Sequence, residues 1–148
     1  MVLNGDLNEH NTVYGGKLLE TLDGTASISA TKFAQQQLVT ASIDQFNFIA
    51  PFKLKDSFRI ISYVSGVGTR SLEIFAKLIG YPASHGKPFL GATAFLTFVA
   101  LNKNCQLPAI KPETIEEIAV CQTYPTRKKF NLQRIAANQE LNPQLKIN

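Results

Sequence analysis

Gly15 and Gly16 open the first predicted helix, and Asp23 follows seven residues after Gly16. At about 100° per residue, Asp23 lies on the border of the apolar stripe of this helix, about 40° around the axis from Leu19. A carboxylate at that border is partly desolvated, which suits a general base or a nucleophile. Glycines at a helix start let a substrate approach the backbone, and the free amides there favour an oxyanion. The pattern indicates a base and an oxyanion hole on one helix; the alternative is an aspartate that only hydrogen-bonds a polar neighbour.

Other kinds of site find little support in the sequence. The two histidines are His10 and His85, and His85 lies in a Gly/Pro loop with no carboxylate close in sequence, so a serine or cysteine triad is poorly supported. Cys105 and Cys121 lack the second pair or the nearby histidine of a zinc site, so we interpret them as free thiols and expect no metal. The glycines between the second and third predicted strands open no helix, which excludes the phosphate-binding loops of nucleotide enzymes.

One helix and four strands must position these residues. Apolar residues at helical spacing predict a helix over 17–34, and β-branched and aromatic residues predict strands over 38–48, 58–67, 71–79 and 89–101. In the first strand, Thr40 and Ser42 are expected to share one face, where contact with a cleft is open. Gly68, Thr69 and Arg70 predict a tight hairpin turn in which the glycine supplies unusual backbone angles. Connections this short exclude parallel crossovers, so the fold class is α+β, with an antiparallel sheet covering the helix.

The length of the chain and the distribution of its charges limit how its domains can be organised. The 148 residues, 45% of them hydrophobic, are enough for one core without a metal or a disulfide. We expect a domain over 1–110 and a C-terminal helix, 113–124, with a basic tail over 111–148. Ten basic and ten acidic residues balance before Arg127, so the net charge of +4 belongs to the tail and does not indicate nucleic-acid binding. No apolar run is long enough to span a membrane and no signal segment opens the chain, so we expect a cytoplasmic protein.

Four segments match a known family in order and spacing. They are GDLNEHNTVYGGKLL at 5–19 with Asp23, VTASID at 39–44 with Phe48 and Pro51, GTRS at 68–71, and AFLTFVAL at 94–101. Together they resemble the active-site signature of hotdog-fold acyl-CoA thioesterases, the bacterial and cytosolic long-chain acyl-CoA hydrolases. The resemblance runs from about residue 3 to 108, with a weaker match at 125–129.

The resemblance implies a hotdog fold, in which a long central helix is wrapped by an antiparallel sheet. It implies a dimer whose sheets join, further assembly to a tetramer or a hexamer, and acyl-CoA sites between subunits. Asp23 would be the catalytic carboxylate, acting as general base on water or as nucleophile on the thioester. Gly16 would donate its backbone N–H to the oxyanion, and Asn8 with Asn11 and Thr12 would orient the carbonyl or the water. CoA is then part of the substrate, and no separate cofactor is expected.

Substrate contacts are implied at three further places. Gly15 would allow close approach, and Gly68, Thr69, Arg70 and Ser71 occupy the place of the family's Gly-Arg-Thr-Ser, although the one-residue shift turns the arginine to the other face of the strand. Asn11 stands where many members have glycine, and asparagine tolerates a left-handed backbone. Arg127 and Lys128, with Lys129, are candidates for the CoA phosphates; the alternative, which we favour, is a solvated tail.

Two other functions stay open for this fold. One is a regulator that binds acyl-CoA without hydrolysing it; such regulators carry a DNA-binding helix-turn-helix, for which this chain has no room. The other is an enoyl-CoA hydratase, which works with a histidine on the central helix, and the helix over 17–34 has none.

Overall fold

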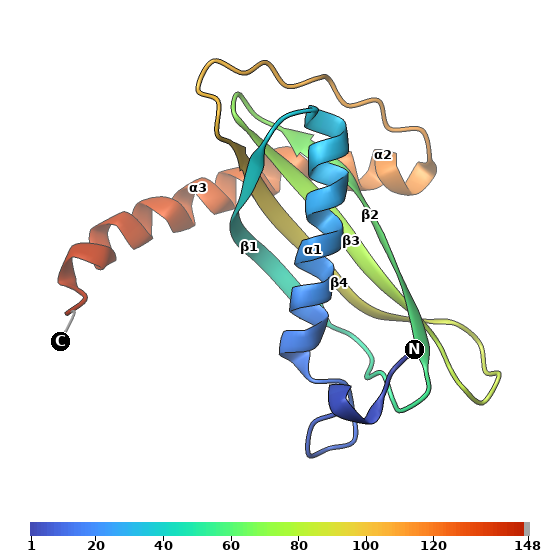
Figure 1. Ribbon diagram of the computed structural model, residues 1–148. Coiled ribbons are helices and arrows are strands. Elements are labelled where there is room, and N and C mark those ends of the chain that lie inside the picture. The colour runs from blue at the N-terminus through green and yellow to red at the C-terminus, as the bar shows by residue number, and fades with distance from the viewer. Residues whose placement is uncertain (147–148) are drawn as a thin grey trace. The chain divides into compact units, whose positions relative to one another are not determined.

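The computed structural model describes residues 1–146 and divides into two compact units, one up to Ile110 and one from Lys111. After a short 3-10 helix, Asn4–Asp6, the first unit contains one long helix and four strands (Figure 1). These are α1 Gly15–Ala34, β1 Leu38–Phe48, β2 Ser57–Val67, β3 Ser71–Tyr81 and β4 Phe89–Ala100. All five were predicted from the sequence, with α1 beginning two residues earlier than expected.

The four strands form one antiparallel sheet in the order β1-β4-β3-β2. Neighbouring side chains alternate between the two faces, so β3 and β4 turn the even-numbered residues toward α1. β1 and β2 are the edge strands among the described residues. The α+β class and the hotdog architecture that the resemblance implied are confirmed.

α1 lies along one face of the sheet, and the core fills the space between them (Figure 1). Small residues meet there from both sides, which lets the helix approach the strands closely. The sequence placed Leu19 in the buried stripe, but Leu18 is the buried residue and Leu19 is only half-buried. The buried residues of α1 are Leu18, Leu22, Ala26, Ala30 and Ala34, and those opposite them in the sheet include Ala76, Ala92 and Ala94.

Two predictions about local backbone had different outcomes. The hairpin between β2 and β3 is present, and the Gly68 N–H donates to the Ser71 carbonyl at 2.7 Å. However, no described glycine has a positive φ, so the unusual angles expected at Gly68 are not there. Asn11 does adopt the left-handed conformation, with φ of 58°.

The first strand also differs from its predicted regularity. Thr40 pairs with Phe98 and Ser42 with Thr97, with a register shift between them. A bulge adds a residue to one strand and reverses which face the following side chains occupy. Thr40 therefore lies on the α1 face and Ser42 on the opposite face, which corrects the expectation that they share one.

The second unit is helical throughout most of its length, with α2 Ile115–Gln122 and α3 Tyr124–Leu141. Thr114 and Glu117 form a reciprocal capping box that starts α2, and Pro125 stands in the first turn of α3. The basic segment expected to be a tail is therefore a helix, because proline at that position favours a helix start. No helix within the described chain is both long and apolar enough to cross a membrane.

The packing around Phe52 can be tested by a substitution at Gly91. The Phe52 ring is 1% exposed and contacts the rings of Phe58 and Phe89. A Cβ at Gly91 would lie 2.0 Å from Phe52 Cζ. We expect Gly91→Ala to lower the free energy of unfolding by about 1–3 kcal/mol, because overpacking displaces side chains and backbone. Gly24→Ala is the control: its Cβ would meet nothing within 4 Å, and helix propensity should add up to about 1 kcal/mol. Urea unfolding measures both, and an unchanged midpoint for Gly91→Ala contradicts the packing described here.

Candidate active site

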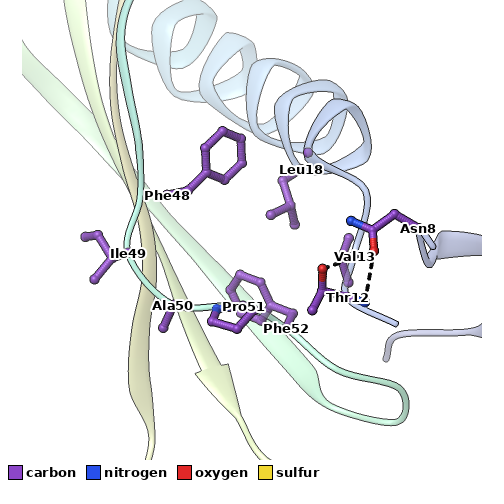
Figure 2. Close-up of a pocket in the computed structure, with 10 residues that line it drawn as sticks. Asn8, Thr12, Val13, Leu18, Phe48, Ile49, Ala50, Pro51 and Phe52 are labelled. Atoms are coloured by element: carbon purple, nitrogen blue, oxygen red, sulfur yellow. Dashed lines mark hydrogen bonds between the residues drawn. The ribbon is translucent and has the colours of Figure 1, made fainter. Parts of the chain in front are cut away.

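A pocket of about 400 Å³ lies between the N-terminus of α1 and the C-terminal end of β1 (Figure 2). Two polar side chains, Asn8 and Thr12, stand on one side of it. The rest of the lining is Gly15 and apolar residues: Val13, Leu18, Phe48, Ile49, Ala50, Pro51 and Phe52. Sequence reasoning placed Phe48 in the first predicted strand and named Phe48 and Pro51 among the family positions, but it did not identify residues 49–52 as a wall of a cavity, since nothing in their composition points to one.

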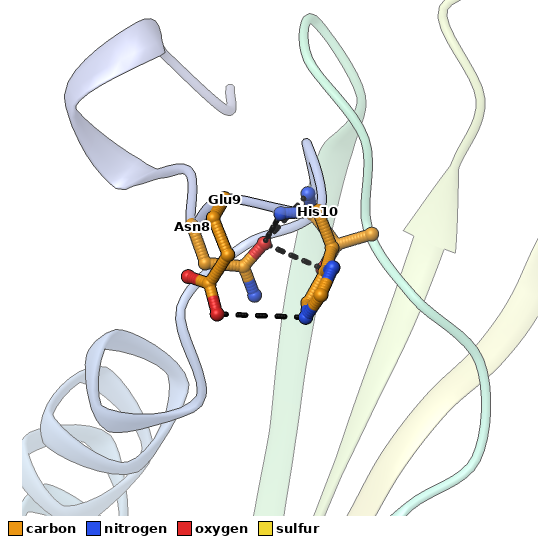
Figure 3. A network of polar contacts seen from close by, with 4 residues as sticks. Asn8, Glu9 and His10 are labelled. Atoms are coloured by element: carbon orange, nitrogen blue, oxygen red, sulfur yellow. Dashed lines mark hydrogen bonds and ion pairs between the residues drawn. The ribbon is translucent and has the colours of Figure 1, made fainter.

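Asn8 is held by its own loop (Figures 2 and 3). Its side-chain oxygen accepts hydrogen bonds from the amide of His10 at 3.0 Å and from the amide and the hydroxyl of Thr12, each at 3.2 Å. The left-handed Asn11 closes the turn, and its N–H donates to the Asn8 carbonyl at 3.0 Å. The Asn8 oxygen is thus used by the loop, and the Asn8 NH₂ has no acceptor among residues 1–146. That NH₂ is the group left to donate to a ligand.

His10 forms an ion pair with Glu9 at 3.4 Å (Figure 3). Both side chains are more than three quarters exposed, at 77% and 79%. An exposed pair of this kind contributes little to stability and is well solvated.

The N-terminus of α1 has free backbone donors. The Tyr14 carbonyl accepts the first helical hydrogen bonds, from Lys17 at 2.9 Å and Leu18 at 3.4 Å. Within the described chain, the amides of Gly15 and Gly16 have no acceptor, and no side chain caps the helix. Aromatic rings occupy the space that the two glycines leave: a Cβ at Gly15 would lie 3.0 Å from Phe48 Cζ, and one at Gly16 would lie 2.8 Å from Tyr14 Cε1.

Asp23 is half-buried at the border of the α1 stripe, as the sequence predicted. Its Oδ1 accepts a hydrogen bond from Thr40 Oγ1 on β1 at 2.9 Å. Thr40 is thus a polar neighbour of the kind expected if Asp23 only makes a structural hydrogen bond. However, Oδ2 of Asp23 has no partner in the part of the chain that the structure describes. The Asp23–Thr40 pair therefore leaves one carboxylate oxygen available for chemistry.

The turn of Gly68, Thr69, Arg70 and Ser71 lies at the opposite end of the sheet from the pocket. Ser71 pairs with Val99, whereas Phe48 of the pocket pairs with Ala92, so about seven residues of β4, or about 23 Å, separate them. Arg70 turns back onto β4, where its Nη2 donates to the Ala100 carbonyl at 3.2 Å. One chain alone thus does not bring this turn to Asn8 and Gly16.

Arg127 and Lys128 belong to the second unit. Arg127 joins the two helices of that unit, since its guanidinium donates to the Val120 carbonyl at 2.9 Å and to Thr123 Oγ1 at 2.5 Å. Lys128 Nζ stands 5.8 Å from the centre of the Tyr124 ring. These cations lie on helix α3, whereas the sequence predicted them in a basic tail after the predicted helix.

The separation along α1 changes the site that the sequence suggested. Asp23 does not line the pocket, and seven helical residues place it about 10 Å from Gly16. The candidate base Asp23 and the free Gly16 amide both lie on α1, but they are too far apart to act on one carbonyl within a single chain. No group of three metal-binding side chains occurs among the described residues, and both cysteines are free thiols.

The chain is similar in sequence to known thioesterases. The model of the Thioesterase superfamily matches residues 10–79. An uncharacterized acyl-CoA thioester hydrolase, YkhA, from Bacillus subtilis is 43% identical over 139 residues, which are 92% of this chain and 81% of that protein.

Solved structures of acyl-CoA hydrolases share the fold. The enzyme from Staphylococcus aureus has a TM-score of 0.91 with 32% identity over 98% of this chain and 91% of its own. It has been solved with butyryl-CoA and CoA, and with an aspartate, a threonine or an asparagine replaced by alanine. In that enzyme the asparagine precedes the aspartate by 15 positions and the threonine follows it by 17.

An acyl-CoA thioesterase described as hexameric has a TM-score of 0.85 and 32% identity, covering 92% of this chain and 89% of its own. With the B. subtilis relative, these similarities extend over nearly the whole chain and agree with the fold and the four sequence segments. The chain belongs to the thioesterase superfamily, among its hotdog-fold acyl-CoA thioester hydrolases.

Proposed function

We infer that this protein hydrolyses acyl-CoA thioesters to a free acid and CoA, in sites that two copies of the chain build together. The observation that carries this inference is the arrangement of Asn8, Asp23 and Thr40. Their separations of 15 and 17 positions are those of the residues replaced in the S. aureus enzyme. Yet a single chain keeps Asn8 at the pocket and Asp23 about 10 Å along the helix, so a second copy must supply one of them.

The free edge of β1 is the natural place for that second copy. Edge strands present unpaired backbone groups that another strand can join, and β1 also exposes Val39 and Ile43 at 45% and 38%. In a two-fold pairing, residue i faces j and j faces i. Antiparallel pairing of two β1 strands about Ile43 places Thr40 of one copy opposite Phe46 of the other, two residues from Phe48. Asp23 of one copy is thereby brought toward the pocket of its partner.

In this composite site the residues have complementary roles. The free Oδ2 of Asp23 removes a proton from water, whose oxygen attacks the thioester carbonyl. The carbonyl oxygen becomes negative and accepts hydrogen bonds from the Gly16 amide and the Asn8 NH₂. The carbon–sulfur bond then breaks, and the CoA thiolate takes the proton from Asp23. Direct attack by Oδ2 on the carbonyl, followed by hydrolysis of the acyl–aspartate, uses the same groups.

The same pairing supports a place for CoA. Because the turn at 68–71 lies at the Thr40 end of the sheet, it accompanies Asp23 toward the partner's pocket. Arg70, Arg127 and Lys128 are cations of the type that bind CoA phosphates, but the first two already donate to carbonyls of this chain. A phosphate contact by these residues stays a prediction.

Assembly beyond the dimer and location are also proposals. The hexameric relative supports a trimer of dimers here. CoA enters and leaves as substrate and product, so we propose no separate cofactor. The cytoplasmic location stays a prediction. Neither the regulator nor the hydratase gains support from the geometry, since α1 presents a carboxylate with a free oxygen and contains no histidine.

Asp23→Asn should abolish hydrolysis while the fold remains. The amide oxygen can still accept from Thr40, but it cannot take a proton or attack the carbonyl. We expect kcat to fall by about 10²–10⁴, the usual contribution of a positioned base. Release of CoA thiol, followed with a disulfide-exchange dye over a panel of acyl-CoAs, measures it. Glu20→Gln, which removes an exposed carboxylate of the same helix, is the control and should keep full activity; wild-type rates for Asp23→Asn refute the assignment.

Mixing two inactive variants tests whether the site is composite. We expect Asn8→Ala and Asp23→Ala to be inactive alone. In a mixed dimer one of the two sites regains both residues, so mixed dimers free of either parent dimer should show about half of wild-type activity. The variants are co-expressed with two different tags and purified through both. If Asn8 and Asp23 act within one chain, the mixed dimers remain inactive.

Asn8→Asp separates the two uses of this side chain. Aspartate keeps an oxygen for the amides of His10 and Thr12 but loses the NH₂ donor. We expect the melting temperature to change little and kcat to fall by about 10²–10³, as for the loss of one oxyanion donor. Thr12→Val is the matched variant, because it removes a hydroxyl bond to Asn8 and costs about 1 kcal/mol of stability. A variant Asn8→Asp with wild-type kcat shows that Asn8 only builds the loop.

A further inference from the structure

The chemistry of the pocket identifies which part of the substrate it suits. This inference rests on the proposed function. Apart from Asn8 and Thr12, the side chains lining the pocket offer only carbon to a ligand, and none is charged. A phosphate or the amide-bearing arm of CoA would leave polar groups unpaired there, which is costly away from water. A hydrocarbon chain meets no such cost, so the pocket fits the acyl part of a thioester whose carbonyl lies beside Asn8 and the α1 amides.

The two phenylalanines of the pocket differ in freedom. Phe52 is 1% exposed, lies against the rings of Phe58 and Phe89, and fills the space over Gly91. It is a fixed wall. Phe48 is 60% exposed at the last residue of β1, so its ring can change rotamer without displacing the core.

Phe48 also stands where the pocket meets the start of α1. Its Cζ lies 3.0 Å from the position of a Cβ on Gly15, and its ring centre is 4.6 Å from that of Phe46. In Figure 2 the ring points toward Leu18 across the pocket. A side chain larger than hydrogen at position 15 would crowd the ring. The Phe48 ring can therefore lie against the helix start, a position that we call its seat, because residue 15 is glycine.

We propose that Phe48 is the residue that sets which acyl-chain lengths the enzyme accepts. With the ring seated on Gly15, it borders the pocket beside the start of α1, and a short chain fits between it, Leu18 and Phe52. A longer chain requires the ring to leave that seat, which exposes apolar surface and loses its contact with the helix start. Short chains are therefore favoured by the wild-type side chain, and a smaller residue at this position removes the discrimination.

The test compares butyryl-CoA with decanoyl-CoA. For Phe48→Ala we expect the ratio of kcat/KM for decanoyl-CoA to that for butyryl-CoA to rise about ten-fold or more, which is the scale of discrimination by one group in an apolar pocket. Phe48→Leu should give a smaller rise, and Phe48→Trp should lower the ratio. Ile28→Ala, at a 57% exposed position of α1, is the control and should leave the ratio unchanged. Size-exclusion chromatography checks that each variant assembles like the wild type.

A second measurement separates failure of this inference from failure of the proposed function. Calorimetric dissociation constants for the two acyl-CoAs are compared between Asp23→Asn and the double variant Asp23→Asn with Phe48→Ala. A shift in their ratio toward decanoyl-CoA supports the role of Phe48 even if the wild type releases no thiol, an outcome that refutes hydrolysis alone. The proposal for Phe48 is overturned if the substitution changes kcat/KM and the dissociation constant equally for butyryl-CoA and decanoyl-CoA. It is also overturned if the substitution changes neither quantity.

Discussion

A single rigid helix determines where the chemistry of this protein can occur. α1 rises about 1.5 Å per residue, so the Gly16 amide and Asp23 stay about 10 Å apart whatever the loops around them do. Rotation of the helix as a whole leaves this distance unchanged, and its buried residues belong to the core that it shares with the sheet. Neither rotation of a side chain nor movement of the loop at Asn8 brings the donors and the base to one carbonyl. In the proposed function the chain therefore contributes two halves of a site, and a second copy joins them.

The edge strand β1 links assembly to catalysis. Thr40 near one end of this strand bonds Asp23, and Phe48 at the other end borders the pocket. In the proposed dimer, antiparallel pairing brings opposite ends of two such strands together, so the contact that forms the dimer also aligns the proposed base and oxyanion donors. In an isolated chain Asp23 remains half-exposed. In the proposed dimer the second copy supplies both the missing donors and the exclusion of water that strengthens electrostatic interactions.

The sequence predicted what depends on local pattern. Apolar side chains alternate along β3 and β4 and recur at helical spacing in α1, because each element buries one face. The position of Asp23 at the border of the buried face follows from the same helical spacing. The failures depend on long-range pairing. The bulge after Thr40 arises from the register against β4, so strand periodicity alone placed Thr40 on the same face as Ser42, away from α1. The helix that contains the basic residues was hidden by their polarity.

Gly15 shows how one residue can serve two requirements. The sequence suggested that its missing side chain lets the substrate reach the helix amides, but the structure fills that space with the ring of Phe48. Both statements describe the same geometry, because a position that tolerates no Cβ admits either a ring or a substrate group. In the proposal for Phe48, a long acyl chain displaces the ring from this position, whereas a short one leaves it in place. The choice between acyl chains and the space beside the Gly15 amide then depend on one contact, so a change at either residue affects both.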